Sequence, residues 1–137
     1  MKADLHIHSR HSPDSSLEPR EIVRLAKARG LKAVALTDHN TVQGHGAMRE
    51  ACAALGLLFI PGIEVTSREG HILAYGVGEA PAQGESAVET IEAVHALGGI
   101  ASAAHPERVY TGLSTAVVRA AKFDAVEAFN SQSAKHH

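Results

Sequence analysis

The sequence of 137 residues contains one cysteine and no tryptophan. A single cysteine excludes an internal disulfide, a four-cysteine zinc site and a zinc site made of two cysteines and two histidines. Cys52 lies in an apolar helical pattern, so we expect a small buried core residue. Aromatic residues make up only 4% of the chain, whereas apolar residues make up 45%. The core must therefore consist mainly of Ala, Val, Ile and Leu, as in parallel strands covered by helices.

Neither sign of charge dominates, because 13 Lys and Arg face 15 Asp and Glu and the formal net charge is -2. This balance argues against a broad surface for bulk nucleic-acid binding, although a short oligonucleotide could still bind in a cleft. No apolar stretch is long enough to span a bilayer, and no apolar signal region follows Met1. We therefore expect a cytoplasmic protein without a membrane partner.

Strand-like and helix-like segments alternate along the chain, which predicts an α/β fold with right-handed crossovers and a largely parallel sheet. Strands are expected at residues 3–8, 33–37, 57–64, 100–104 and 124–129, with the third interrupted near Pro61-Gly62. Helices are expected at 18–29, 45–55, 86–97 and 113–121, and an extended run at 70–76 turns back. We interpret residues 1–137 as one domain, with 136–137 as a possible tag remnant. A closed barrel needs more chain, so the sheet is open or the domain continues.

Histidine is abundant, with ten residues, and several potential metal ligands lie at the ends of predicted strands. His6 and His8 project to the same side of a strand, because side chains alternate with a period of two. Carboxyl ends of parallel strands meet at one edge, where α/β barrels build their sites. The candidate ligands are His6, His8, Asp14, His39, Glu64, His71 and His105.

This mixture of imidazoles and carboxylates suits Zn, Mn or Fe rather than Ca. A set of this size indicates more than one cation, and a carboxylate such as Glu64 can bridge two of them. Paired cations about 3.5–4 Å apart activate water and stabilise both oxygens of a displacement. Asp14 lies in a sequence that is also typical of a turn, and His11 is the alternative ligand there. His45 and His95 lie on predicted helices, where we expect solvent-exposed or capping side chains.

Five stretches together resemble the PHP family (polymerase and histidinol phosphatase), in family order across about residues 3–130. They are Asp4-Leu5-His6-Ile7-His8-Ser9, Leu36-Thr37-Asp38-His39-Asn40, Gly62-Ile63-Glu64-Val65, Gly70-His71-Ile72-Leu73-Ala74-Tyr75-Gly76 and Ala104-His105-Pro106. The resemblance implies a distorted seven-stranded α/β barrel with two or three divalent metals, here incomplete or open on its C-terminal side. The segments around Asp14 and Asp38 are more similar to the small stand-alone phosphoesterase and nuclease branch than to the polymerase domain.

Carried over residue by residue, the resemblance implies three metal positions. His6 and His8 would bind the first metal, His71 and His105 the second, and Glu64 would bridge these two; Asp14 and His39 would bind a third. Members of the family end with a late Asp-x-His motif that supplies one more ligand each to the first and third metals. No such motif follows His105 in these 137 residues.

The function predicted from these features is hydrolysis of a phosphate ester by metal-activated water. Glu64 and Asp38 are assigned to the catalytic machinery, Asp38 as a partner that orients an imidazole. Substrate-binding candidates are Arg10 and Arg108, whose guanidinium groups can grip phosphate, and Asn130, which the resemblance places beside the substrate pocket. The substrate would be a small phosphomonoester, a nucleotide or a short oligonucleotide. Alternatives are a non-catalytic metal-stabilised module, a polymerase-associated domain, or metal-dependent hydrolysis of an amide or C–N bond.

Overall fold

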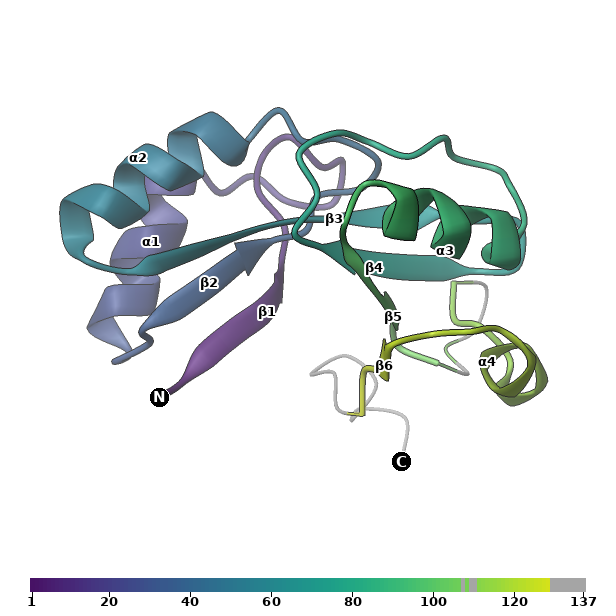
Figure 1. Cartoon of the computed structure of the whole chain (residues 1–137). Coiled ribbons are helices and arrows are strands. Elements are labelled where there is room, and N and C mark those ends of the chain that lie inside the picture. Colours follow the sequence, from purple (N-terminus) through teal and green to yellow (C-terminus); the bar gives the residue numbers. More distant parts are fainter. Residues whose placement is uncertain (107, 109–110, 129–137) are drawn as a thin grey trace.

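The computed structural model describes residues 1–106, 108 and 111–128, and Figure 1 shows its architecture. Within these residues six strands form one curled sheet in the order β1-β2-β3-β4-β5-β6. The strands are β1 (Ala3–Ile7), β2 (Ala33–Leu36), β3 (Leu58–Thr66), β4 (His71–Tyr75), β5 (Ile100–Ala103) and β6 (Ala125–Val126). The sheet is an open half-barrel, which confirms the predicted α/β class and the opening on the C-terminal side.

The helices lie within the expected segments, and local sequence signals account for their ends. They are α1 (Pro19–Ala28), α2 (His45–Leu55), α3 (Ala87–Ala96) and α4 (Thr115–Ala120). Pro19 begins α1, and the hydroxyl of Ser86 caps α3 by accepting the N–H of Glu89. Gly56 ends α2 with a φ of +76°, a conformation that glycine adopts without strain. None of the helices in the described ranges is long and apolar enough to cross a membrane.

Strand direction agrees with the largely parallel sheet expected from the sequence, with one strand running the other way. β1, β2 and β3 are parallel, and β5 is parallel to β6. β4 is antiparallel to both of its neighbours, β3 and β5, because a short turn returns the chain after Thr66. A tight turn can join only antiparallel strands, whereas parallel pairs need a longer crossover. The predicted return of the chain at residues 70–76 is confirmed, and it makes the sheet mixed.

β3 is continuous through Pro61 and Gly62, which corrects the predicted interruption. Its residues up to Pro61 pair with β2, and its residues from Gly62 onwards pair with β4. A Cβ atom on Gly62 would lie 3.0 Å from the carbonyl oxygen of Ala74 and 3.1 Å from that of Leu36. Glycine is therefore needed here because three strands approach closely. The Pro-Gly pair marks the point where the strand exchanges partners.

Two groups of buried apolar side chains lie at opposite ends of this shared strand. One packs α1 and α2 against β2 and the start of β3, and it includes Val23, Leu36, Met48 and the buried Cys52, as predicted. The other packs α3 against β3, β4 and β5 and includes Ile63, Ile72 and Val94. Figure 1 shows α1 and α2 beside the first strands and α3 beside β4. The strand ends between the two groups remain accessible.

Candidate metal centre

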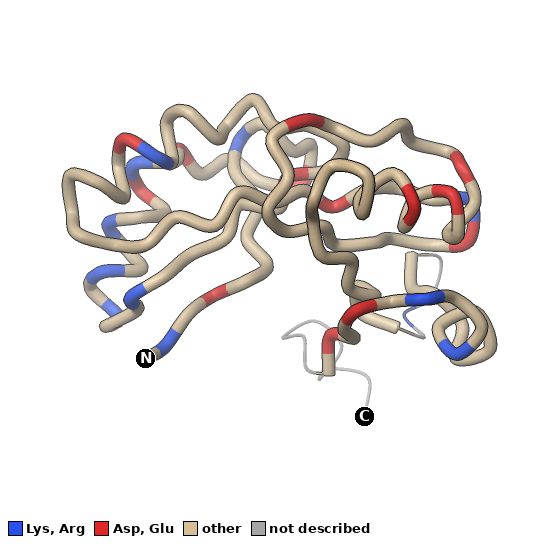
Figure 2. The backbone as a smooth tube through the Cα atoms, in the orientation of Figure 1, with Lys and Arg blue, Asp and Glu red and all other residues tan. Residues whose placement is uncertain are grey.

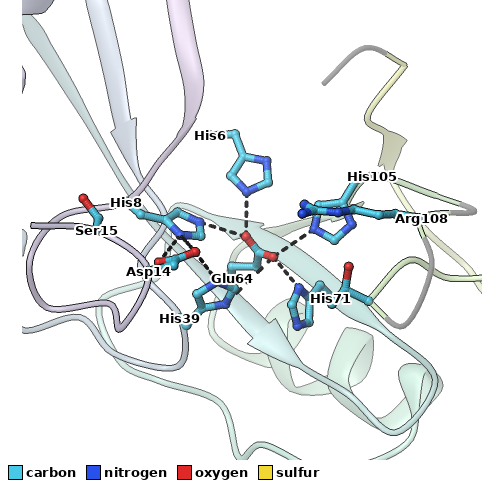
Figure 3. A pocket seen from close by; sticks show the side chains of 10 residues that line it. His6, His8, Asp14, Ser15, His39, Glu64, His71, His105 and Arg108 are labelled. Atoms are coloured by element: carbon cyan, nitrogen blue, oxygen red, sulfur yellow. Dashed lines mark hydrogen bonds and ion pairs between the residues drawn. The ribbon is translucent and has the colours of Figure 1, made fainter. Parts of the chain in front are cut away.

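The predicted ligands converge at one edge of the sheet, as the strand-end argument requires. His6 and His8 come from the end of β1, His39 follows β2, and Glu64 lies in the second half of β3. His71 begins β4, which runs antiparallel, so its first residue meets the last residues of its neighbours. His105 follows β5 at the same edge. Figure 3 shows these side chains pointing toward one another around Glu64.

Glu64 lies at the centre, and each of its carboxylate oxygens contacts two imidazoles. Oε1 lies 2.6 Å from Nε2 of His6 and 2.9 Å from Nε2 of His8. Oε2 lies 2.7 Å from Nδ1 of His71 and 3.2 Å from Nε2 of His105. The side chain of Glu64 is only 1% exposed. This division of the imidazoles between two oxygens is the one that the resemblance implies for a bridging carboxylate.

Asp14 forms a second, more exposed part of the cluster. Its two oxygens lie 3.0 and 2.9 Å from Nδ1 of His8, and one of them lies 3.1 Å from Nε2 of His39. Nδ1 of His39 also lies 3.9 Å from Glu64. His8 and His39 therefore each face both carboxylates, which joins the three predicted metal positions into one cluster. The alternative ligand His11 belongs to none of the described groups with metal-ligand spacing.

Among the described residues, three groups of side chains have potential ligand atoms within 4.8 Å of one another: His6, Glu64 and His105; His8, Asp14 and His39; His39, Glu64 and His71. The first and third groups separate His71 from His105, unlike the pairs that the resemblance implies. Nδ1 of His71 is buried and close to Glu64, yet it makes no hydrogen bond within the described part of the chain. An imidazole nitrogen that faces a carboxylate without donating to it is suited to share a cation with it. The residues present therefore fit a polynuclear site for divalent metals.

The carboxylate and the imidazoles stabilise each other's charges in this cluster. Burial alone raises the pKa of Glu64, but the four imidazoles around its carboxylate outweigh this effect and hold that pKa far below its usual range. Burial alone lowers the pKa of His6, but hydrogen bonds to Glu127 and Glu64 outweigh this effect and raise that pKa to about 9. Protons and cations therefore compete for the same nitrogens, as is general for histidine ligands.

A cavity of about 460 Å³ opens over the cluster. The predicted ligands line it, together with Ser15, Arg108 and Thr111. Lys and Arg residues concentrate on α1 and its flanks (Figure 2), whereas Arg108 is the only Lys or Arg among the described residues that line the cavity. A single guanidinium beside a cluster of metal-ligand type is suited to orient one phosphate group.

The other predicted site residues lie elsewhere. Nε of Arg10 donates to Glu18 at 2.9 Å, and Arg10 does not line the cavity as described. Asp38 does not orient an imidazole through any described hydrogen bond; it accepts from the N–H and hydroxyl of Ser9, both at 2.6 Å, and from the hydroxyl of Ser12. Because Ser9 and Ser12 donate to both oxygens of this carboxylate, Asp38 positions the loop that contains them rather than an imidazole. Asn130 lies outside the described residues.

Several contributing residues were not predicted from the sequence. Glu127 directly follows β6, so it lies at a strand end as the predicted ligands do. Its Oε2 lies 2.6 Å from Nδ1 of His6. Ser12 links Asp38 to the backbone N–H of His39, which its hydroxyl accepts at 2.7 Å. His45 is buried, contrary to expectation, because its Nε2 lies 2.7 Å from the carbonyl oxygen of Gly62. His95 is exposed, as expected, and pairs with the carboxylate of Asp124.

Known proteins are similar to this chain in sequence and in fold. A protein of uncharacterized function from Methanocaldococcus jannaschii is 37% identical over 95% of this chain and 82% of its own length. A phosphoribosyl 1,2-cyclic phosphate 1,2-diphosphodiesterase from Eggerthella lenta is 39% identical over 70% of this chain, which spans only 39% of that enzyme. A predicted metal-dependent phosphoesterase from Bifidobacterium adolescentis has the same fold, with a TM-score of 0.80 and 19% identity over 99% of this chain and 81% of its own.

The family assignment rests on a match along nearly the whole length of the chain. The model of the PHP domain matches residues 4–130, from the first strand to beyond β6. The match includes all the residues whose side chains meet around Glu64. The chain therefore belongs to the PHP domain family.

Proposed function

We propose that this chain is a metal-dependent phosphoesterase, which binds two or three divalent cations and hydrolyses a phosphate ester with water as the attacking group. Zn, Mn and Fe are the cations that the donor set favours. The proposed substrate is a small phosphomonoester, or a phosphate of a nucleotide or short oligonucleotide. The cytoplasmic location expected from the sequence is part of this proposal.

The arrangement of Glu64 carries the proposal. Glu64 is a buried carboxylate with two imidazoles at each oxygen, and it would hold divalent cations together with those imidazoles. Its negative charge would offset the repulsion between the cations. When bound, paired divalent cations lower the pKa of water and neutralise charge on the phosphate. No covalent intermediate on the protein is required.

Arg108 is proposed to hold the phosphate from the side of the cavity opposite Asp14. Figure 3 shows its side chain beside His105, at the mouth of the cluster. A planar guanidinium can donate two parallel hydrogen bonds to phosphate oxygens. Ser15 and Thr111 also line the cavity and offer hydroxyl groups, with the buried hydroxyl of Thr111 making no hydrogen bond within the described ranges. These groups supply polar contacts to a ligand.

Two measurements test the proposal together. The purified protein is loaded with Mn or Zn and freed of excess metal, and its metal content is then measured. Hydrolysis of p-nitrophenyl phosphate is followed above the rate given by buffer and metal alone. We expect bound metal and turnover that a chelator abolishes. Bound metal without turnover on any phosphate ester would instead support the non-catalytic module.

Substrate class is tested on the same preparation. Small phosphomonoesters are compared with nucleoside bisphosphates and with short 5′-phosphorylated oligonucleotides, each at several concentrations. The ratio kcat/KM ranks them, because it reports discrimination between competing substrates. A cavity of about 460 Å³ can enclose a small ester or one nucleotide, so longer chains should gain little over a mononucleotide.

A further inference from the structure

Both ring nitrogens of His6 are engaged, each by a different carboxylate. Nε2 lies 2.6 Å from Glu64, and Nδ1 lies 2.6 Å from Oε2 of Glu127. The side chains of His6 and Glu127 are 15% and 12% exposed, so water has little access to their contact. A carboxylate can only accept a hydrogen bond. Glu127 therefore favours a proton on Nδ1, so that Nε2 is the nitrogen whose proton a cation at Glu64 can replace.

The second oxygen of Glu127 acts on another candidate ligand. Oε1 accepts the backbone N–H of His105 at 3.0 Å. His105 has a φ of +23°, a positive value that is unfavourable for a residue with a side chain. The hydrogen bond helps to hold this backbone conformation, in which Nε2 of His105 reaches Glu64. One carboxylate thus contacts two of the residues around the centre, one through its ring and one through its backbone.

Glu127 also joins the two ends of the sheet. β1 and β6 are the outermost strands in the described sheet order, and no ladder connects them. The curl of the sheet nevertheless brings His6, in β1, within 2.6 Å of Glu127, which directly follows β6. The contact between His6 and Glu127 spans this opening. The position of His6 relative to His105 therefore depends on a side chain rather than on backbone pairing.

We propose that Glu127 is a positioning residue of the metal centre, which selects the Nδ1-protonated form of His6 and holds His105 in place. Nε2 of both imidazoles is thereby presented to a cation at Glu64. This inference rests on the proposed metal-dependent function. Partners of this kind, which fix the proton and orientation of a ligand histidine, commonly change metal affinity by about 10–100-fold when removed.

Glu127→Gln and Glu127→Asp separate this role from a purely structural one. Glutamine keeps the length of the side chain and can still accept the N–H of His105. Its amide N–H would then face Nδ1 of His6 and favour a proton on Nε2, the nitrogen needed for the cation. Aspartate is shorter but keeps a pure acceptor for His6. A structural brace would tolerate glutamine better than aspartate, whereas the proposed role predicts the reverse for metal binding.

The experiment measures zinc affinity by competition with a chelator at fixed pH, together with two-bond ¹H–¹⁵N NMR spectra of the zinc-loaded protein. We expect zinc affinity at the tightest site to fall about 10–100-fold in Glu127→Gln and less in Glu127→Asp. In the wild-type protein His6 should show a proton on Nδ1 and a coordinated Nε2. In Glu127→Gln that coordinated signal should be lost. Glu92→Gln, on the exposed face of α3, is the matched control and should match wild type.

Thermal unfolding of the metal-free variants checks that they are folded, and we expect Glu127→Gln to remain folded. A loss of zinc affinity then cannot be attributed to unfolding. Unchanged zinc affinity and an unchanged His6 signal in Glu127→Gln would overturn the inference. A greater loss in Glu127→Asp than in Glu127→Gln would also overturn it, in favour of a brace. Failure of the wild-type protein to bind metal would instead overturn the proposed function. The two ideas therefore fail by different results.

Discussion

Two buried carboxylates lie near the ends of neighbouring strands, and their surroundings differ in one respect. Glu64 and Asp38 are 0% and 1% exposed. Glu64 is surrounded by imidazoles, whereas Asp38 accepts from the hydroxyls of Ser9 and Ser12 and from a backbone N–H. A neutral imidazole has a lone pair and can bind a cation, whereas an amide N–H can only donate. The two carboxylates are equally buried, so their different roles follow from the groups around them: Glu64 belongs to a candidate metal centre, and Asp38 anchors a loop.

Asp38 nevertheless contributes to the geometry around Glu64. Its contacts hold the loop that connects β1 to α1, and Asp14 projects from that loop. Ser12 in the same loop accepts the N–H of His39. One carboxylate therefore offers direct contacts for cations, and the other fixes the segment that supplies additional ligands. Substitutions at the two positions should have different consequences, and this difference can be measured.

Glu64→Gln should have the largest effect on hydrolysis. The neutral amide no longer offsets the charge of two cations, so bound metal should fall and kcat should drop about a thousandfold, equivalent to about 4 kcal/mol. The fold should persist, because the amide fits the same space. Metal content, turnover of p-nitrophenyl phosphate and circular dichroism are measured on one preparation. His95→Ala, in the last turn of α3 and outside the described lining of the cavity, is the control; a near-normal kcat in Glu64→Gln would refute the assignment.

Asp38→Asn should mainly affect stability. The amide provides one acceptor oxygen instead of two and turns an N–H₂ group toward donors of Ser9, so the free energy of unfolding should fall by about 2–4 kcal/mol. Urea denaturation of the metal-free protein measures this loss. Ser12→Ala removes one of the same contacts and should cost about 1 kcal/mol. If Asp38→Asn kept full stability but lost hydrolysis, as expected for Glu64→Gln, the proposed contrast between the carboxylates would be wrong.

Arg108→Ala should have a smaller effect, which concerns substrate binding at the centre around Glu64 and not stability. If Arg108 grips the phosphate of the bound substrate, its loss should raise KM about tenfold and leave kcat nearly unchanged. Steady-state kinetics over a wide range of substrate concentration give both constants. Arg119→Ala, on the exposed surface of α4, provides the matched control. A large fall in kcat with constant KM would show that Arg108 acts in the transition state instead.

Asp124→Asn should have the smallest effect, because this carboxylate pairs with an imidazole in contact with water. Asp124 accepts the N–H of Ala101 at 2.8 Å and lies 2.7 Å from Nε2 of His95. The backbone hydrogen bond, and then the one with His95, lower the pKa of Asp124. Its contribution to stability is therefore complete above about pH 4 and is lost as the pH falls through the lowered pKa.

Urea denaturation of wild-type protein and Asp124→Asn across this pH range checks that prediction. The difference in unfolding free energy should be small near neutral pH and should shrink further below about pH 4. A difference that grows in acid would reverse the expected sign. A large difference at neutral pH would show that an exposed imidazole–carboxylate pair matters as much as the buried ones, which would weaken the comparison with Glu64.

Local signals made much of the fold predictable. The bounds of α2 follow from the sequence because Gly56 ends its apolar pattern and adopts a positive φ. The behaviour of Pro61 and Gly62 was not predictable in the same way. A Pro-Gly pair usually indicates the end of a strand, but β3 continues because its two halves pair with different strands. Pairing between distant segments is not contained in local propensity.

The candidate site was predictable where it depends on strand ends and unpredictable where it depends on curvature. His6, Glu64 and His105 follow from apolar runs that end in polar residues. Glu127 ends such a run too, after Ala125 and Val126, and this position was the available signal. Its contact with His6 exists only because the curled sheet brings β1 near β6. The sequence of neither strand indicates that the two strands lie close together. The hydrogen bonds of Ser12 likewise depend on the tertiary structure.

The exchange of partners along β3 has a consequence for cooperativity. One strand supplies a wall to each of the two buried apolar groups, through Phe59 on one side and Ile63 on the other. Opening either group disturbs one end of that strand, so the free energies of opening are coupled. We therefore expect the two groups to unfold as one unit rather than independently. Glu64 lies on the same strand, so the centre is protected by the stability of the whole chain rather than by that of its own neighbourhood.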